Sequence, residues 1–351
     1  MNCCESLDVR VEPAALRPGI DRRTTLKALG GAAAVAAVSA SGVAQAQALT
    51  KVKLAFCGQL LCVVPYEVTR ERGRFRAEGI DMELVYTRGG SAAMQALVGG
   101  AVDYAGTAFD VAVQARSRGA DVVRFASTGR LPLFALAIAP KNKDTVNALK
   151  DLENKTVGVS GLGNADHALA VFLMTKAGAK ADTVKFAVIG TNLFDALRLG
   201  QVDAGMVQEP ALSLIVEAGG KALINIMDIE HARTHLGGPY EFMGVAIRAE
   251  ERTQRLDEMR RLARALTKGL IDTRTLPVAE VAAALPKELV AGGDRARFER
   301  ILERYRTSLY PESVRIDLDA AQRAVDSLDV AGLLKAPVDL SKLLDREVVG
   351  G

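Results

Sequence analysis

The chain has 351 residues, of which 49% are hydrophobic, and its 45 Lys and Arg nearly balance its 42 Asp and Glu, for a formal net charge of +3. This length suits one large domain or two medium ones, and the mixed composition is typical of a soluble globular protein. The small net charge argues against nucleic acid as a partner, and no segment is long and apolar enough to cross a membrane.

Residues 1–48 are predicted to be an export signal that is removed from the mature protein. Arg22 and Arg23 come first, an apolar run rich in Ala and Gly follows, and two overlapping Ala-Gln-Ala sequences end at Ala48. This order is typical of export signals, and the arginine pair resembles the twin-arginine type. A soluble N-terminal helix is the alternative. The signal predicts a periplasmic location without a lipid anchor, because no cysteine stands at the cleavage region.

The mature chain opens with a predicted alternation of strands and helices. Short apolar or alternating runs predict strands over residues 51–58, 80–87 and 102–107. The first intervening helix has Pro65 near its start and Gly73 at its end, and the second runs from a cap at Ser91 through Val98. This order indicates a parallel sheet with right-handed crossovers.

The second half is predicted to repeat this order. The predicted strands cover residues 131–140, 155–161, 183–191, 202–207 and 240–250. A short helix precedes the second of them, a helix over 164–179 is stopped by Gly178, and another begins at a cap on Thr191 or Asn192 and runs through Leu199. The rest of the chain is predicted to be helical, over residues 252–275, 277–286, 294–310 and 317–334.

Two short segments, residues 88–107 and 190–209, are similar to each other. Gly, Ala, Leu, Gly, Val and Asp at positions 90, 96, 97, 100, 102 and 103 recur 100 residues later. The same order of strands and helices flanks both copies, which indicates a duplicated α/β half. The long strands near 131–140 and 240–248 are the candidate hinges. We therefore predict an α/β fold of two lobes, with residues 49–138 and 239–351 in lobe 1 and residues 139–238 in lobe 2.

Small residues and helix starts follow the carboxyl ends of predicted strands in both halves. Ligands of open α/β sheets bind at this edge, and free N–H groups at helix N-termini attract anions or polar groups. The candidate ligand-binding residues are Gly58, Gln59, Gly90, Ser91, Thr107 and Asp110 in lobe 1, and Ser160, Asn164, Thr191, Asn192, Gln208 and Glu209 in lobe 2. For each residue the alternative is a cap or turn without ligand contact.

The charged residues near these positions indicate what kind of ligand could bind. Asp110 and Glu209 are predicted to end strands at the cleft, and if both face inward the ligand offers hydrogen-bond donors or a cationic group. Asp103 and Asp203 each follow a Gly-x-Val sequence at a strand entrance, and we expect their carboxylates to fasten turns. A solvated side chain is the favoured interpretation of Arg88.

Few features of the sequence point to a cofactor, a metal or catalysis. Cys57 and Cys62 are interpreted as two buried free thiols, with a disulfide as the alternative. His231 and His235 lack a third ligand at a recognisable spacing, so no metal site is predicted. The motifs of serine hydrolases, phosphate-binding loops and zinc proteases are absent, and no cofactor is expected.

Several stretches together resemble a known family. They are "GGSAAMQALVGGAVDYAGT", "KTVGVSGLGNADHALAVFLMTKAG", "ALRLGQVDAGMVQEP", "LGGPYEFMGVAIR" and "GLLKAPVDLSKLLD". The chain is similar to the periplasmic solute-binding proteins of ABC importers in the nitrate, sulfonate and taurine group, which includes binders of thiamine-pyrimidine precursors. The resemblance implies a type II fold with two crossover strands as hinge, and a ligand between the lobes. It draws the site from Gly90 and Ser91, Thr107, Ser160 with Asn164, and Gln208 with Glu209.

The resemblance also implies what the protein does. It implies a monomer that delivers a small polar organic solute, anionic or zwitterionic, to a membrane permease with a cytoplasmic ATPase, contacts the membrane only through that permease, and does no chemistry. The alternatives are a pyrimidine-type thiamine-precursor binder, or a sensor or enzyme on the same scaffold. Two departures, "CGQLLCVVPYEV" and a second-lobe turn "SGLGNADH" without a Ser/Thr-rich run, leave the ligand open.

Overall fold

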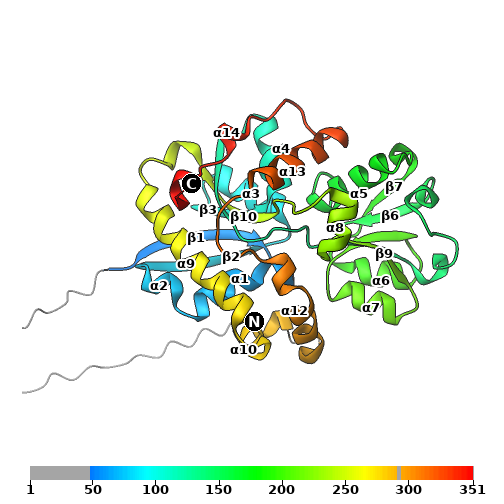
Figure 1. Cartoon of the computed structure of the whole chain (residues 1–351), viewed down its shortest axis with the longest axis horizontal. Coiled ribbons are helices and arrows are strands. Elements are labelled where there is room, and N and C mark those ends of the chain that lie inside the picture. Colours follow the sequence, from blue (N-terminus) through cyan, green and yellow to red (C-terminus); the bar gives the residue numbers. More distant parts are fainter. Residues whose placement is uncertain (1–47, 291–293, 351) are drawn as a thin grey trace, which may run out of the picture. The chain divides into compact units, whose positions relative to one another are not determined.

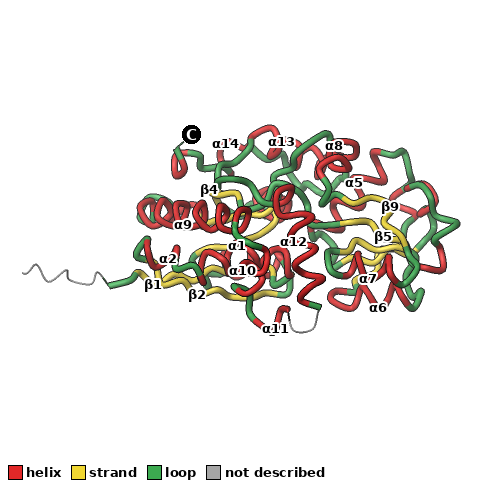
Figure 2. Tube along the Cα trace, turned by 60° about the horizontal axis from the view of Figure 1, so that its bottom comes forward, coloured by secondary structure: helices red, strands yellow, loops and turns green. Residues whose placement is uncertain are grey.

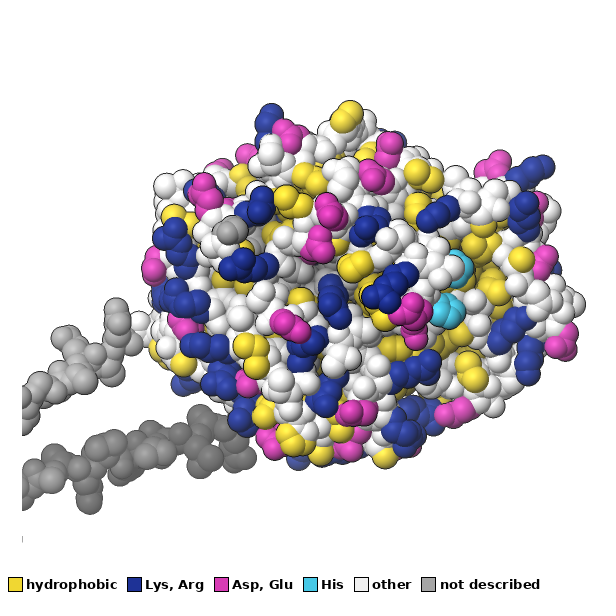
Figure 3. All heavy atoms as spheres, viewed as in Figure 1, with side chains coloured by type: hydrophobic (Ala, Val, Ile, Leu, Met, Phe, Trp, Pro, Cys, Tyr) yellow, Lys and Arg dark blue, Asp and Glu magenta, His cyan; other side chains and the backbone are white. Residues whose placement is uncertain are grey.

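The computed structural model describes residues 48–290 and 294–350, which form two mixed β-sheets covered by helices (Figure 1). All of the predicted export signal except its last residue, together with Cys3 and Cys4, lies outside the described residues. Within these ranges, no helix is both long and apolar enough to span a bilayer. On the face shown in Figure 3, cationic and anionic side chains are interspersed.

Sheet A contains five strands in the order β2-β1-β3-β10-β4. These are β1 (Thr50–Cys57), β2 (Ile80–Thr87), β3 (Tyr104–Ala108), β4 (Val122–Ser127) and β10 (Met243–Arg248). Strand β1 is parallel to both neighbours, so that Leu54 pairs with Leu84 on one side and with Tyr104 on the other. Strand β10 is antiparallel to β3 and to β4.

Sheet B has the same design, in the order β7-β6-β8-β5-β9. Its strands are β5 (Ala135–Ile138), β6 (Thr156–Val159), β7 (Lys185–Val188), β8 (Ala204–Val207) and β9 (Lys221–Asn225). Strand β6 is parallel to β7 and β8, and β5 is antiparallel to β8 and β9. Each strand of one sheet therefore has a counterpart in the other, which confirms the predicted duplication and the two-lobed α/β fold.

The two aspartates of the repeat make the same contacts in both sheets. The Asp103 backbone N–H donates to the carbonyl of Lys53, whose own N–H donates to the Asp103 carboxylate at 2.7 Å. Asp203 makes both bonds with Thr156, each at 2.9 Å. Each carboxylate thus fastens a turn to the strand with two parallel neighbours in its sheet, β1 or β6, as predicted.

Helices from both halves of the chain cover sheet A. From the first half they are α1 (Leu60–Glu71), α2 (Arg74–Ala77), α3 (Gly90–Val98) and α4 (Phe109–Ser117). From the C-terminal half they are α9 (Leu256–Thr275), α10 (Val278–Ala283), α11 (Lys287–Val290), α12 (Arg295–Leu309), α13 (Leu318–Val330) and α14 (Leu340–Leu343). Helix α9 packs along α1 and α2 (Figure 2).

Sheet B is covered by α5 (Ala165–Lys176), α6 (Leu193–Arg198), α7 (Ala211–Glu217) and α8 (Ile229–Leu236). Two C-terminal helices also reach this lobe. Helix α13 packs against both α4 and α5. In α12, the Tyr305 hydroxyl accepts a hydrogen bond from the Asn225 amide at 2.9 Å, and Arg297 pairs with Glu217 of α7 at 3.0 Å.

Two segments carry the chain between the sheets, residues 128–134 and residues 239–242. They run antiparallel and bond to each other through the backbone: the N–H groups of Tyr240 and Phe242 donate to the carbonyls of Arg130 and Gly129, and Thr128 donates to Met243. The strand predicted over 131–140 is thus shorter than expected, because residues 131–134 belong to this crossing pair and only Ala135–Ile138 joins sheet B.

Other predicted boundaries also change. The strands β4 and β9 were not predicted. Ser91 is not a cap, since α3 begins at Gly90 after Gly89. Helix α1 begins at Leu60, so that Pro65 is its sixth residue rather than near its start. A proline there removes the N–H that would donate to the carbonyl of Leu61. The Tyr310 hydroxyl replaces it, donating to that carbonyl at 2.8 Å.

Replacing Tyr310 by phenylalanine is therefore expected to lower the free energy of unfolding by about 1–3 kcal/mol, because it leaves a buried carbonyl without a donor. Urea unfolding would measure the loss. Pro65→Ala restores the helical N–H, so the Tyr310→Phe cost should shrink when both changes are combined. Equal costs in both backgrounds would contradict this role for the hydroxyl.

Candidate functional site

Residues from both sheets enclose a small cavity beside the crossing segments. Its floor is apolar and comes mainly from Phe134, Phe242 and Met243. The remaining lining residues are Cys57, Gln59, Cys62, Gly89, Gly90, Ala108 and Val111 on the side of sheet A, and Ser160, Asn164, Ala165, Asp166 and Gln208 on the side of sheet B. The cavity volume is only about 30 Å³, which suits a single water molecule. This cavity is therefore closed in the structure.

A second hollow of about 200 Å³ continues from this cavity over sheet B. It shares Gln59, Phe134, Ser160, Asp166 and Gln208 with the cavity. Its other lining residues include Gly190, Phe194 and Glu209. We call the two hollows together the cleft. The polar groups of the cleft lie above an aromatic floor, an arrangement that suits a small solute with one polar end.

Three helices begin at the cavity. Helices α1, α3 and α5 follow Gln59, Gly89 and Asn164, and none of these three residues accepts a capping hydrogen bond with its side chain. The first N–H groups of each helix have no partner within the helix, and they carry the positive end of its dipole. Among the described residues that line the cavity, none is Lys, Arg or His. A negative group there would be attracted by these backbone N–H groups and by the neutral hydroxyl and amide donors of the lining.

Side chains join the lobes directly across the cleft. The Ser91 hydroxyl donates to Oδ1 of Asn164 at 2.6 Å, and Nδ2 of Asn164 donates to the Ser160 hydroxyl at 3.0 Å. The side chain of Gln208 donates to that of Gln59. Five of the predicted ligand-binding residues thus contact one another across the cleft.

Asp166 is a cleft residue that the sequence did not single out as a ligand-binding group. It is fully buried in the first turn of α5 and accepts bonds from the Ser160 backbone N–H at 2.5 Å and from the Ser160 hydroxyl at 2.9 Å. Burial raises the pKa of its carboxyl, although the Ser160 hydrogen bonds oppose this. The sequence feature that could have indicated Asp166 as a cleft residue is its position in the turn "SGLGNADH".

The other predicted ligand-binding residues differ in how close they lie to the cavity. Gly58 adjoins the cavity and bonds the Thr87 carbonyl through its N–H. Glu209 is buried, its carboxylate accepts two bonds from Ser213 at 3.0 Å, and burial raises its pKa. Asn192 is exposed at the start of α6 without a capping bond, and the side chain of Thr191 is outside those described.

Thr107 and Asp110 lie behind the wall of the cavity, contrary to the prediction. Thr107 is fully buried beneath Gly90. Strand β3 ends at Ala108, so Asp110 is the second residue of α4 rather than a strand end, and it turns into the core. There its carboxylate accepts a bond from the Tyr240 hydroxyl at 2.6 Å, and burial raises its pKa to about 6. We leave both residues out of the site.

The cysteines and histidines considered in the sequence do not form a metal site. The thiols of Cys57 and Cys62 are free and buried. Nδ1 of His231 accepts a bond from the Asn225 backbone N–H at 3.2 Å, so that nitrogen is already engaged. In residues 48–290 and 294–350, no group of three His, Cys, Asp or Glu side chains is placed to hold a metal ion.

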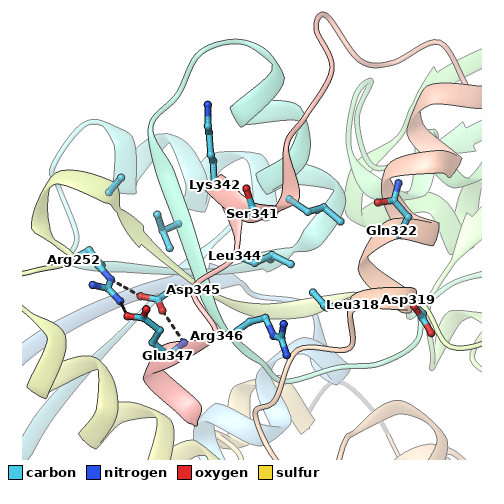
Figure 4. Close-up of a pocket in the computed structure, with 13 residues that line it drawn as sticks. Arg252, Leu318, Asp319, Gln322, Ser341, Lys342, Leu344, Asp345, Arg346 and Glu347 are labelled. Carbon is cyan, nitrogen blue, oxygen red and sulfur yellow. Dashed lines mark hydrogen bonds and ion pairs between the residues drawn. The ribbon is translucent and has the colours of Figure 1, made fainter. Parts of the chain in front are cut away.

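A larger groove, of about 810 Å³, lies between α13 and the C-terminal segment (Figure 4). Three of its charged side chains are paired with one another: Arg252 donates to Asp345 at 2.6 Å and to Glu347 at 2.5 Å. All of its lining residues belong to the part of the chain that covers sheet A. It therefore lacks the two-sided enclosure of the cleft.

Solved structures with the same fold include binding proteins from several bacteria. A protein of Bordetella bronchiseptica RB50 aligns with a TM-score of 0.76 at 24% identity, over 85% of this chain and 95% of that one. The alkanesulfonate-binding protein SsuA from Xanthomonas axonopodis pv. citri, bound to MOPS, aligns at 0.66 and 18% identity, over 84% and 98%. The periplasmic nitrate-binding protein NrtA from Synechocystis PCC 6803 aligns at 0.68 and 12% identity, over 86% and 87%.

These likenesses define the class of fold, which is that of the two-lobed periplasmic binding proteins. The chain belongs to the NMT1/THI5-like family, whose model matches residues 63–279. No curated protein matches the chain in sequence. The resemblance drawn from the sequence is thus confirmed at the level of family and fold.

Proposed function

We propose that this protein is the extracytoplasmic substrate-binding component of an ABC importer. It captures a small polar organic solute, anionic or zwitterionic, in the cleft between the sheets, and it performs no chemistry on that solute. Closure around the solute then presents the docking surface for a permease with a cytoplasmic ATPase. Residues 1–48 direct export to the periplasm by the twin-arginine type of signal, and the protein acts as a monomer.

The observation that carries this proposal is the meeting of three helix N-termini at one cavity. Helices α1 and α3 belong to one sheet and α5 to the other, so a solute oxygen bound there bonds both lobes at once. Asp166 and Glu209 suit a donor or cationic group elsewhere on the same solute. Such a ligand favours the closed form because it contacts both sides only when the cleft is shut.

The crossing segments support a hinge, and the strand pairing refines the proposed lobe boundary. Because β5 pairs with β8 and β9, we assign residues 135–138 to lobe 2, together with 139–238. Lobe 1 then contains residues 49–127 and 243–351, and segments 128–134 and 239–242 cross between the lobes. An opening motion about these segments enlarges a cavity that is too small for any organic solute when closed.

A thermal-shift screen of the purified protein tests the proposal. The compounds are nitrate, alkanesulfonates including MOPS, taurine, carboxylates, amines and pyrimidines. The chain has no Trp, so the readout is a dye or calorimetry. A ligand at 100 times its Kd adds about 2.7 kcal/mol of stability, a shift of several degrees. Chemical conversion of a bound compound would contradict the proposal and support an enzyme. A response to pyrimidines alone would favour the thiamine-precursor binder.

Ser91→Ala is expected to weaken binding of any compound found in this screen by about tenfold, because it removes one hydrogen bond at the cavity. Calorimetric titration measures the change in Kd. Ser341→Ala is the matched control, because Ser341 lines the groove of Figure 4. If Ser341→Ala weakened binding and Ser91→Ala did not, the ligand would bind in the groove and not in the cleft.

A further inference from the structure

Two thiols stand at either end of the turn that begins α1. Cys57 is the last residue of β1 and Cys62 is the third residue of α1. Both are buried, with 7% and 3% of their surface exposed, and both line the cavity. Both side chains therefore border the same space of about 30 Å³. In the part of the chain that the structure describes, they are the only two cysteines.

The turn between them is held on both sides. The Cys62 backbone N–H donates to the Gln59 carbonyl at 2.9 Å, and the Gly58 N–H donates to the Thr87 carbonyl at 2.9 Å. Gln59 also accepts the hydrogen bond from Gln208 of the opposite lobe. A covalent bond between the two thiols would therefore act directly on a residue that joins the lobes.

We propose that Cys57 and Cys62 are a redox site, which forms a reversible disulfide by exchange with an external disulfide compound. The site follows from the place of both buried thiols in the wall of one small cavity and from the ordered turn between them. This redox site does not depend on which solute the protein binds, or on whether the protein takes part in transport.

The exchange takes two balanced steps. The Cys57 thiolate attacks one sulfur of the external disulfide, whose S–S bond breaks, and the other half leaves and takes up a proton as a thiol. Cys62 then loses its proton and attacks the Cys57 sulfur of the mixed disulfide, which releases the second thiol. The two protein thiols are oxidised and the external disulfide is reduced to two thiols.

The surroundings assign the order of the two cysteines. The hydrogen bond with Cys62 lowers the pKa of the Cys57 thiol, and that same bond together with burial raises the pKa of the Cys62 thiol. Cys57 is also the more exposed of the two. Cys57 is therefore the attacking thiol and Cys62 the resolving thiol. Because the closed cavity holds only about 30 Å³, the external compound reaches Cys57 when the cleft opens.

Equilibration in glutathione buffers tests the site. The full chain carries Cys3→Ser and Cys4→Ser, so that only the two cleft thiols react. Its disulfide content is measured by acid quench, alkylation and mass spectrometry, in native buffer and in urea. The equilibrium constant for the Cys57–Cys62 disulfide should be at least about tenfold larger in the native protein, because the fold holds the thiols together. An equal or smaller constant in the native protein would overturn the proposal.

Single variants test the assigned order. In the same background, Cys62→Ser should accumulate a mixed disulfide of Cys57 with glutathione, and Cys57→Ser should keep Cys62 free at the same buffer ratio. Modification of Cys62 in Cys57→Ser to an equal extent would overturn the order. The equilibrium measured on the chain with both thiols needs neither variant to fold, so it decides the redox site by itself.

Discussion

Replacing Arg124 by methionine is expected to lower the free energy of unfolding by about 3–5 kcal/mol. Arg124 lies in β4 with none of its surface exposed. Its guanidinium donates to the carbonyls of Thr107 and Phe242 at 2.9 and 2.7 Å and to the buried Glu241 carboxylate at 3.3 Å. The substitution removes these three hydrogen bonds and leaves the buried Glu241 carboxylate without its cationic partner. The Phe242 carbonyl keeps the Phe109 N–H as a donor at 2.6 Å, and Phe242 lines the cavity. Urea unfolding followed by circular dichroism measures the loss.

A matched control is Arg76→Met, which removes an arginine whose side chain is 73% exposed and pairs with Asp81 at 3.7 Å. Its expected cost is within about 0.5 kcal/mol. Adding Glu241→Gln to Arg124→Met should recover part of the loss, because it removes the buried charge that the methionine leaves unpaired. A loss for Arg124→Met as small as that for Arg76→Met would mean that the buried guanidinium does not hold the crossing segments.

The stability of the protein is expected to fall as the pH rises from about 4 to about 7. Burial raises the pKa of Asp110 from its usual 3.8 to about 6, so the folded state holds a proton that the unfolded state has already released. The stabilisation is complete below about pH 4 and is lost as the pH rises through about 6. A difference of about two pKa units corresponds to about 3 kcal/mol.

Asp110→Asn should remove this part of the slope, because an amide does not titrate. Glu241 contributes in the same direction, since burial raises its pKa to about 7, so the variant keeps a shallower slope. Asp339→Asn is the control, as Asp339 is exposed and its pKa is lowered by bonds from Ser341. Urea unfolding at pH 4, 5, 6 and 7 measures the slopes. The same slope for Asp110→Asn as for the unmodified protein would show that Asp110 is ionised throughout.

The sequence predicted the repeated α/β order because each copy combines a short apolar strand with a helix that glycine ends. It missed β4 because Arg124 interrupts the run "VVRFAS", and an arginine in a run usually indicates the surface. Here the arginine is inside because backbone carbonyls from two elements point at it. It missed β9 because "KALIN" is short and only partly buried. In both cases only the tertiary contacts show that the segment forms a strand.

The site was predictable where it depends on the edge of a sheet. Gln59, Gly90, Ser160, Asn164 and Gln208 meet at the cavity because strands of both lobes end there. Asp110 was misplaced because the sequence did not show that α4 begins at Phe109, directly after β3, and the first turn of this helix directs Asp110 into the core. Phe134 and Phe242 were missed because the crossing segments were predicted as strands. That prediction gives no reason for the two phenylalanine side chains to line a cleft.

The two sheets differ in how the chain supplies their strands. All five strands of sheet B come from one continuous stretch, Ala135–Asn225, whereas sheet A needs β10, which follows that stretch. Until Met243–Arg248 leaves the ribosome, β4 has no strand partner and β3 has an open edge. We therefore expect the nascent chain to complete sheet B before sheet A, although sheet A begins first. A chain truncated before Met243 would leave an aggregation-prone edge beside a finished lobe.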